Sequence, residues 1–128
     1  TEIENVVTGS GDDTIVANEV VNVMDGGDGN DIFRFQTTDD ADGDTIMNFE
    51  AGDVIDLSFI DANGGAPGDG AFTLVTGGLT GAGQLSVSYE ARDDGTYAVI
   101  EGSTTSAAAD FTLNVKTDLT LTTSDFGL

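Results

Sequence analysis

The chain has 128 residues, with 24 Asp or Glu against three Lys or Arg, no His and no Cys, and its formal net charge at pH 7 is −21. This charge argues against a nucleic-acid partner or an anionic membrane surface, because both attract clustered cations. The missing His and Cys exclude zinc fingers, thiolate nucleophiles and Ser-His-Asp triads, and leave carboxylate and carbonyl oxygens, the ligands that Ca²⁺ and Mg²⁺ prefer.

The length and the 38% of hydrophobic residues predict one domain over residues 1–128. No apolar run approaches the roughly 18 residues of a membrane-spanning helix, so we expect no membrane insertion. The chain begins at Thr1 without the basic and apolar layout of a signal peptide. We interpret it as a C-terminal piece of a longer protein.

A nine-residue period occupies residues 1–36. Thr8–Val16 aligns with Gly26–Arg34 at an offset of 18 residues, and this superimposes two glycines, one apolar residue and the pair Asp13 and Asp31. Residues 17–25 keep the register without any Gly. If each unit forms one turn and one short strand, two units complete a coil, and units 18 residues apart stack in a parallel β-roll.

This pattern resembles GGxGxDxUx, the calcium-binding repeat of the RTX (repeats-in-toxin) proteins. Glycine permits turns that aim carbonyl oxygens inward, and Asp supplies a charged oxygen. The resemblance implies a Ca²⁺ ion between the two turns and none at residues 17–25. Its ligands would be the carboxylates of Asp13 and Asp31 and the carbonyls of Gly9, Gly11, Gly26 and Asp28. Ordinary Gly-Asp turns that need no metal are the alternative.

Residues 37–71 are predicted to form an acidic loop at Asp39–Asp44 and connecting strands. Such a charge run is commonly a solvated loop. However, the order DIFRF, acidic loop, GDTIMNFEAGDVIDLS and then alternating strands resembles the C-terminal region of serralysin-type metalloproteases. It is also similar to the R modules of secreted alginate epimerases, and the resemblance covers nearly the whole chain.

The serralysin resemblance implies further ligands. Asp40 and Asp44 match carboxylates that complete a last calcium site, which would also take the Asp31 carboxylate and the carbonyls of Gly27 and Gly29. We therefore expect about two Ca²⁺ ions, each with the usual 6–8 oxygen ligands.

Two other Asp residues lie outside these two predicted sites. Asp53 also matches a family ligand, but its partners would come from the Gly-free repeat at residues 17–25, so it is the weaker candidate. Asp56 is expected to cap or hydrogen-bond locally.

Residues 72–128 show a period of two, which predicts antiparallel strands at Leu85–Tyr89 and Phe111–Lys116. Turn signals at Asp93–Gly95 and Gly102–Ser106 separate them, and glycine-rich loops are expected at 63–70 and 77–83. No helical periodicity is present. The predicted fold class is all-β: a short parallel β-roll that continues into antiparallel, sandwich-like strands.

Two features of this half bear on partners. Tyr89 and Tyr97 are either a sugar-stacking pair or, as is more common on strands, core or edge residues. Thr123–Leu128 resembles the terminal signature of substrates of the ABC-transporter-driven (type I) secretion route, although a last edge strand is the simpler alternative.

Together these features predict a calcium-responsive, non-catalytic module of a secreted, extracellular protein, loose at low calcium and folded at extracellular calcium. Its expected partners are calcium, the N-terminal domain of the parent protein and the type I secretion machinery. The alternative is a calcium-dependent polysaccharide-binding module of a carbohydrate-active enzyme. A glycosidase-type carboxylate pair is disfavoured because the acids cluster in the repeat turns, and the serralysin motif HExxH is absent from the chain.

Overall fold

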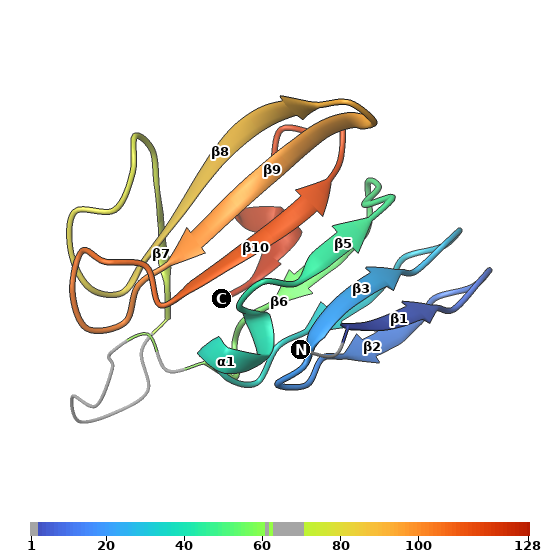
Figure 1. Cartoon of the computed structure of the whole chain (residues 1–128), viewed down its shortest axis with the longest axis horizontal. Coiled ribbons are helices and arrows are strands. Elements are labelled where there is room, and N and C mark those ends of the chain that lie inside the picture. Colours follow the sequence, from blue (N-terminus) through green and yellow to red (C-terminus); the bar gives the residue numbers. More distant parts are fainter. Residues whose placement is uncertain (1–2, 61, 63–70) are drawn as a thin grey trace.

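The computed structural model describes residues 3–60, 62 and 71–128; the loop expected at 63–70 lies outside these ranges. Within them the chain forms two β-sheets (Figure 1). The four-stranded sheet has the order β11 (Phe126–Gly127), β6 (Val54–Asp56), β4 (Ile32–Arg34) and β2 (Thr14–Val16). The seven-stranded sheet has the order β1 (Ile3–Val7), β3 (Val21–Asp25), β5 (Thr45–Met47), β10 (Phe111–Lys116), β9 (Gly95–Gly102), β8 (Gln84–Arg92) and β7 (Thr73–Val75).

The first half is the predicted parallel β-roll. The chain alternates between the two sheets, so that β1, β3 and β5 pair in parallel in one sheet and β2, β4 and β6 in the other. The first coil stacks on the second with the predicted offset of 18 residues, since Thr14 pairs with Ile32. The next offset is 22 residues, since Ile32 pairs with Val54.

The roll therefore extends beyond residue 36, its predicted end. The strands β5 and β6, expected only as connections, form a third coil. Their inward side chains Ile46 and Ile55 are fully buried beside Met24 and Phe33 of the second coil. The same alternation of apolar residues that buries the second coil thus buries the third.

The acidic loop contains a short helix that the sequence does not predict, because no helical periodicity marks it. This helix, α1 (Thr38–Ala41), spans four residues, the same number that the third coil adds to the 18-residue offset. Thr37 is its N-cap, and the Thr37 hydroxyl accepts the Asp40 backbone N–H at 3.1 Å. A one-turn helix is too short to produce an amphipathic period, so its cap is the stronger sequence signal.

The second half forms the predicted antiparallel strands. The hairpin β8–β9 runs from Leu85 opposite Gly102 to Arg92 opposite Gly95, with the expected turn between. The strand β10 pairs antiparallel with β9 and parallel with β5, so it joins the hairpin to the roll in one continuous sheet. The fully buried Leu113 and Val115 of β10 belong to the core between the sheets.

The end of the chain returns to the roll. A turn of 3₁₀ helix, η1 (Thr123–Asp125), leads into β11, which pairs in parallel with β6. The simpler expectation of a last edge strand is therefore confirmed in structure. Neither α1 nor η1 approaches the length of a membrane-spanning helix, and the described residues contain no other helix.

Candidate metal centres at the two edges of the roll

The turns that follow β1, β3 and β5 stack at one edge of the roll, here called the first edge (Figure 1). The Gly11 N–H donates to the Asp28 carbonyl at 2.9 Å, and the Asp28 N–H donates to the Gly9 carbonyl at 3.0 Å. Gly27 and Gly29 have φ of 76° and 119°, and a Cβ on either would overlap the carbonyl of Gly9 or Gly11 in the coil before. The close stacking of the turns thus requires glycine at both of these positions.

The last residue of each first-edge turn is an Asp, and the three carboxylates form a ladder across the coils. The Asp13 N–H donates to Asp31 Oδ1 at 3.0 Å, and the Asp31 N–H donates to Asp53 Oδ1 at 2.9 Å. Asp31 and Asp53 are only 0% and 2% exposed. Neighbouring coils therefore place buried acidic groups directly above one another.

Two of these carboxylates keep one oxygen without a partner. The Oδ2 atoms of Asp13 and Asp31 are buried and have no hydrogen-bond partner in the described part of the chain. Burial raises the pKa of Asp31, and repulsion from Asp53 and Asp13 adds to this, against the Asp13 N–H bond, which lowers it. A buried carboxylate of this kind is destabilising unless a cation or proton neutralises it.

A second centre lies at the opposite edge of the roll, here called the second edge, where the chain enters β3 and β5. Asp44 is fully buried, and its Oδ1 accepts the Asn22 N–H at 2.7 Å. Its Oδ2 is buried and without a partner among the residues described. Burial raises the pKa of Asp44 to about 7, and the charges of Asp40 and Asp42 contribute despite the Asn22 bond.

The structure corrects the predicted grouping of these residues. Asp40 and Asp44 do not join the turn of Gly27, Gly29 and Asp31, because Asp44 precedes β5 of the seven-stranded sheet and Asp31 precedes β4 of the other sheet. Asp53, the weaker candidate, stands in their place against Asp31.

Asp44 instead faces Asn22 of the Gly-free repeat. The sequence signal that could have shown this is the 22-residue step from Asp31 to Asp53, which is one 18-residue coil plus the four residues of α1.

The carboxylates alone do not complete either centre, since no group of three or more Asp or Glu side chains converges on one point within the described ranges. Any cation would need backbone carbonyls as its other ligands. The predicted carbonyls of Gly9, Gly26 and Asp28 each accept one hydrogen bond across the first edge. A carbonyl oxygen has two lone pairs, so each keeps one for a cation.

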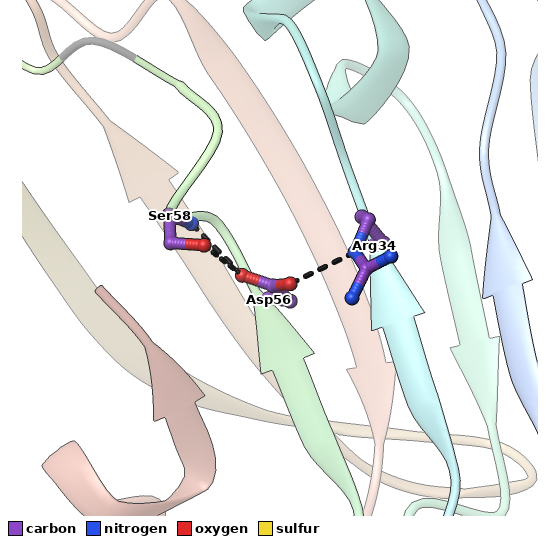
Figure 2. Close-up of polar contacts among 3 residues, drawn as sticks. All are labelled: Arg34, Asp56 and Ser58. Carbon is purple, nitrogen blue, oxygen red and sulfur yellow. Dashed lines mark hydrogen bonds and ion pairs between the residues drawn. The ribbon is translucent and has the colours of Figure 1, made fainter.

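Figure 2 shows a different role for Asp56, on the outer face of the four-stranded sheet. Its carboxylate accepts Arg34 Nε at 2.9 Å and the Ser58 N–H at 3.0 Å, which confirms the expected local hydrogen bonding. Burial alone would raise the pKa of Asp56, but the Ser58 and Arg34 bonds outweigh it and lower the pKa. The Arg34 guanidinium also lies 4.9 Å from the Phe59 ring centroid. This network ties the second coil to the third.

Tyr89 and Tyr97 do not form a sugar-stacking pair. Tyr89 is opposite Ala98, and Tyr97 is opposite Glu90, so the two rings lie on opposite faces of the sheet. Tyr97 is 6% exposed beneath Arg92, and its hydroxyl donates to Asp94 at 2.9 Å.

A polar pocket of about 270 Å³ lies nearby. Its lining residues are Asn48, Phe49, Glu50, Asp94, Gly95, Thr96, Lys116, Thr117 and Asp118. Phe49 is the aromatic residue among these lining residues, and it is buried. The pocket therefore offers no exposed ring on which a sugar could stack.

Comparisons with known proteins agree with this architecture. Residues 1–127 match the family described as peptidase M10 serralysin C terminal. A search of curated proteins finds no match. Among solved structures, the chain is similar to the AlgE6R3 subunit of the Azotobacter vinelandii mannuronan C5-epimerase, with a TM-score of 0.62 and 20% sequence identity. The match covers 95% of this chain and 66% of that chain, and at this identity it shows the fold. The chain belongs to the serralysin C-terminal family of the M10 peptidases, a family of calcium-binding-type accessory modules.

Proposed function

We propose that this chain is a calcium-binding, non-catalytic module of a secreted protein, which is loose at low calcium and folds at extracellular calcium. The observation that carries the proposal is a set of three atoms, the Oδ2 oxygens of Asp13, Asp31 and Asp44, here called the open oxygens. Each is buried and lacks a hydrogen-bond partner among the described residues. A fold that buries three such groups is incomplete without cations.

The charge distribution supports this proposal. Residues 1–56, which form the roll, hold 15 of the 24 acidic residues and only Arg34 as a cation. This excess opposes the stacking of coils through repulsion between like charges. Arg34 is already engaged by Asp56 on the outer face, so it cannot neutralise the carboxylates at either edge.

The open oxygens fit calcium better than softer metals, because every candidate ligand is a carboxylate or a carbonyl oxygen. At the first edge, Asp13 and Asp31 would hold the cation with the carbonyls of the stacked turns. At the second edge, Asp44 would hold one with Asp40. The bound ion supplies positive charge at these points. The chain contributes rigid, buried oxygens that stacking has already brought together.

Calcium that binds only the folded chain stabilises it by mass action. The gain is about 2.7 kcal/mol per site when free calcium is 100 times the dissociation constant. Extracellular modules commonly have dissociation constants of about 10⁻⁴ to 10⁻³ M. Two sites at millimolar calcium would thus change the folded fraction of a marginally stable chain, and a low-calcium cytosol would leave it loose for type I export from the cell.

The proposal is tested by calorimetric calcium titration with far-UV circular dichroism, starting from chelator and repeated with magnesium. We expect a calcium-specific gain of β-structure with about two ions bound. Asp31→Asn should raise the calcium midpoint and remove binding at the first edge. Asp93→Asn, in the exposed hairpin turn, is the matched control. A chain that is fully folded in chelator and takes up no calcium would refute the proposal.

A further inference from the structure

The C-terminal segment, residues 117–128, crosses from the seven-stranded sheet to the four-stranded sheet (Figure 1). It leaves β10 and ends as β11, where Phe126 pairs with Ile55 and Gly127 with Asp56. The Leu57 N–H donates to the Gly127 carbonyl at 2.8 Å. The strand β11 therefore covers the edge of β6 that β4 leaves open.

The fold buries two apolar residues of this segment. Phe126 and Leu121 are each 6% exposed and belong to the core. The Leu121 N–H donates to the Tyr89 hydroxyl at 2.8 Å. The Asp125 carboxylate accepts the Thr122 N–H at 2.8 Å. In the part that resembles an export signature, Phe126 is thus buried, whereas the half-buried Asp125 is bonded only within its own turn.

We propose that β11 is a latch that hides this signature whenever the chain is folded. A receptor that binds the segment in extended form must take the Phe126 side chain and the Gly127 backbone that β6 already holds. Folding and receptor binding then compete for the same residues, so a folded chain withdraws its own export segment. This inference rests on the proposed function, in which the receptor is the type I exporter.

Two features make β11 suitable as a latch. It pairs with β6 through only two residues, so it can leave without unpairing the other strands. It is also closely fitted, because a Cβ on Gly127 would lie 2.9 Å from Asp56 Oδ1. Arg34 and Ser58 hold Asp56 in place (Figure 2). The latch is therefore short but linked to the network that joins the second and third coils.

The first test is protection from carboxypeptidase. The 128-residue chain, folded as judged by circular dichroism, is digested, and release of its last four residues is followed by mass spectrometry. A synthetic peptide of residues 117–128 is the unprotected reference. We expect release from the folded chain to be at least about 100-fold slower than from the peptide, with the two rates equal in urea. Equal rates without urea would overturn the proposal.

A matched pair of variants tests whether protection comes from β6. Ile55→Ala removes the side chain opposite Phe126, and Ile15→Ala makes the same change in the same inward row on β2. We expect Ile55→Ala to release the end at least about tenfold faster than Ile15→Ala. Equal rates would contradict a local latch. If Ile55→Ala does not fold, Gly127→Ala provides the test from outside the core.

The second test uses proteoliposomes that contain a purified serralysin-type exporter. The folded chain, the chain freshly diluted from urea into chelator and the synthetic peptide are compared for binding. We expect the peptide and the unfolded chain to bind and the folded chain to bind at least about tenfold more weakly. Binding of the folded chain as tight as that of the peptide would overturn the latch. Failure of the peptide itself to bind would refute the export part of the proposed function, while the digestion experiment still decides whether β11 is protected.

Discussion

At the scale of single residues, equivalent glycines in the stacked turns have different surroundings. Gly11 and Gly29 occupy equivalent positions, with φ of 106° and 119°. No described atom lies within 4 Å of a Cβ built on Gly11, whereas a Cβ on Gly29 would overlap the Gly11 carbonyl. Both positions have a positive φ that strains any other residue, but only at Gly29 would a side chain also overlap the neighbouring coil.

This difference gives the first prediction. Gly11→Ala and Gly29→Ala should both destabilise the chain through the positive φ, and Gly29→Ala should cost about 1–3 kcal/mol more because the Gly11 carbonyl must move. Urea unfolding of both variants at saturating calcium measures the difference. Equal losses would mean that the turns do not stack as closely as described.

The second prediction concerns Asp56, whose pKa is lowered in the folded chain. A lowered folded-state pKa means that the stabilising charge is fully present above the unfolded value and is lost as the pH falls through the folded value. Asp56→Asn should therefore cost about 1–3 kcal/mol at pH 7. The gap to the parent chain should shrink below about pH 4.

Urea unfolding of both proteins between pH 7 and pH 3 measures this difference in the free energy of unfolding. The other buried carboxylates are the same in both proteins, so their contribution to the difference cancels. A gap that stays constant over this range would show that the Arg34 and Ser58 bonds do not depend on the Asp56 charge.

At the scale of elements, α1 shows how a loop can build a centre. The helix adds four residues to the roll, carries Asp40 and places it near the buried Asp44. Its N-cap is the Thr37 hydroxyl. The local order of this turn therefore decides how the second edge presents its oxygens.

The third prediction follows from that cap. Thr37→Ala should cost about 1 kcal/mol of local helix stability and weaken calcium binding at the second edge by roughly fivefold, without changing the first edge. Thr38→Ala, one residue along, keeps the cap and serves as control. Calorimetric titration that resolves two classes of site measures the effect. An equal loss of calcium affinity in both variants would mean that the cap of α1 has no role in calcium binding.

At the scale of the whole molecule, the two halves are unequally held together. The strands β2 and β4 are joined by three residue pairs, whereas β8 and β9 are joined by eight. The roll also carries most of the acidic charge. Yet β10 pairs with both β9 and β5, so the two halves share one sheet and one core.

The fourth prediction is that removal of calcium loosens the roll first. Backbone amides of β2 and β4 should exchange at least about tenfold faster in chelator than in calcium, while those of β9 and β10 change less, because repulsion between the open oxygens is confined to the roll. Hydrogen–deuterium exchange with mass spectrometry measures both. Equal changes in all four strands would indicate that the molecule opens as one cooperative unit.

The sequence by itself determined the all-β class, the 18-residue step between the first two coils and the stacking of Asp13 on Asp31, because glycine, Asp and apolar residues recur at fixed local distances. It also predicted the turn at Asp93–Gly95 and the local role of Asp56. These features depend on neighbours along the chain or on one repeat length, so a linear pattern is enough to reveal them.

Only the tertiary structure decided which carboxylates meet. Asp53 replaced Asp44 beside Asp31 because the alternation between sheets assigns successive turns to opposite edges, and α1 changed the step from 18 to 22 residues. The third coil, the opposite faces of Tyr89 and Tyr97 and the return of β11 to β6 were decided in the same way. Each depends on pairing between strands distant in sequence, which burial of a shared core selects and no local pattern encodes.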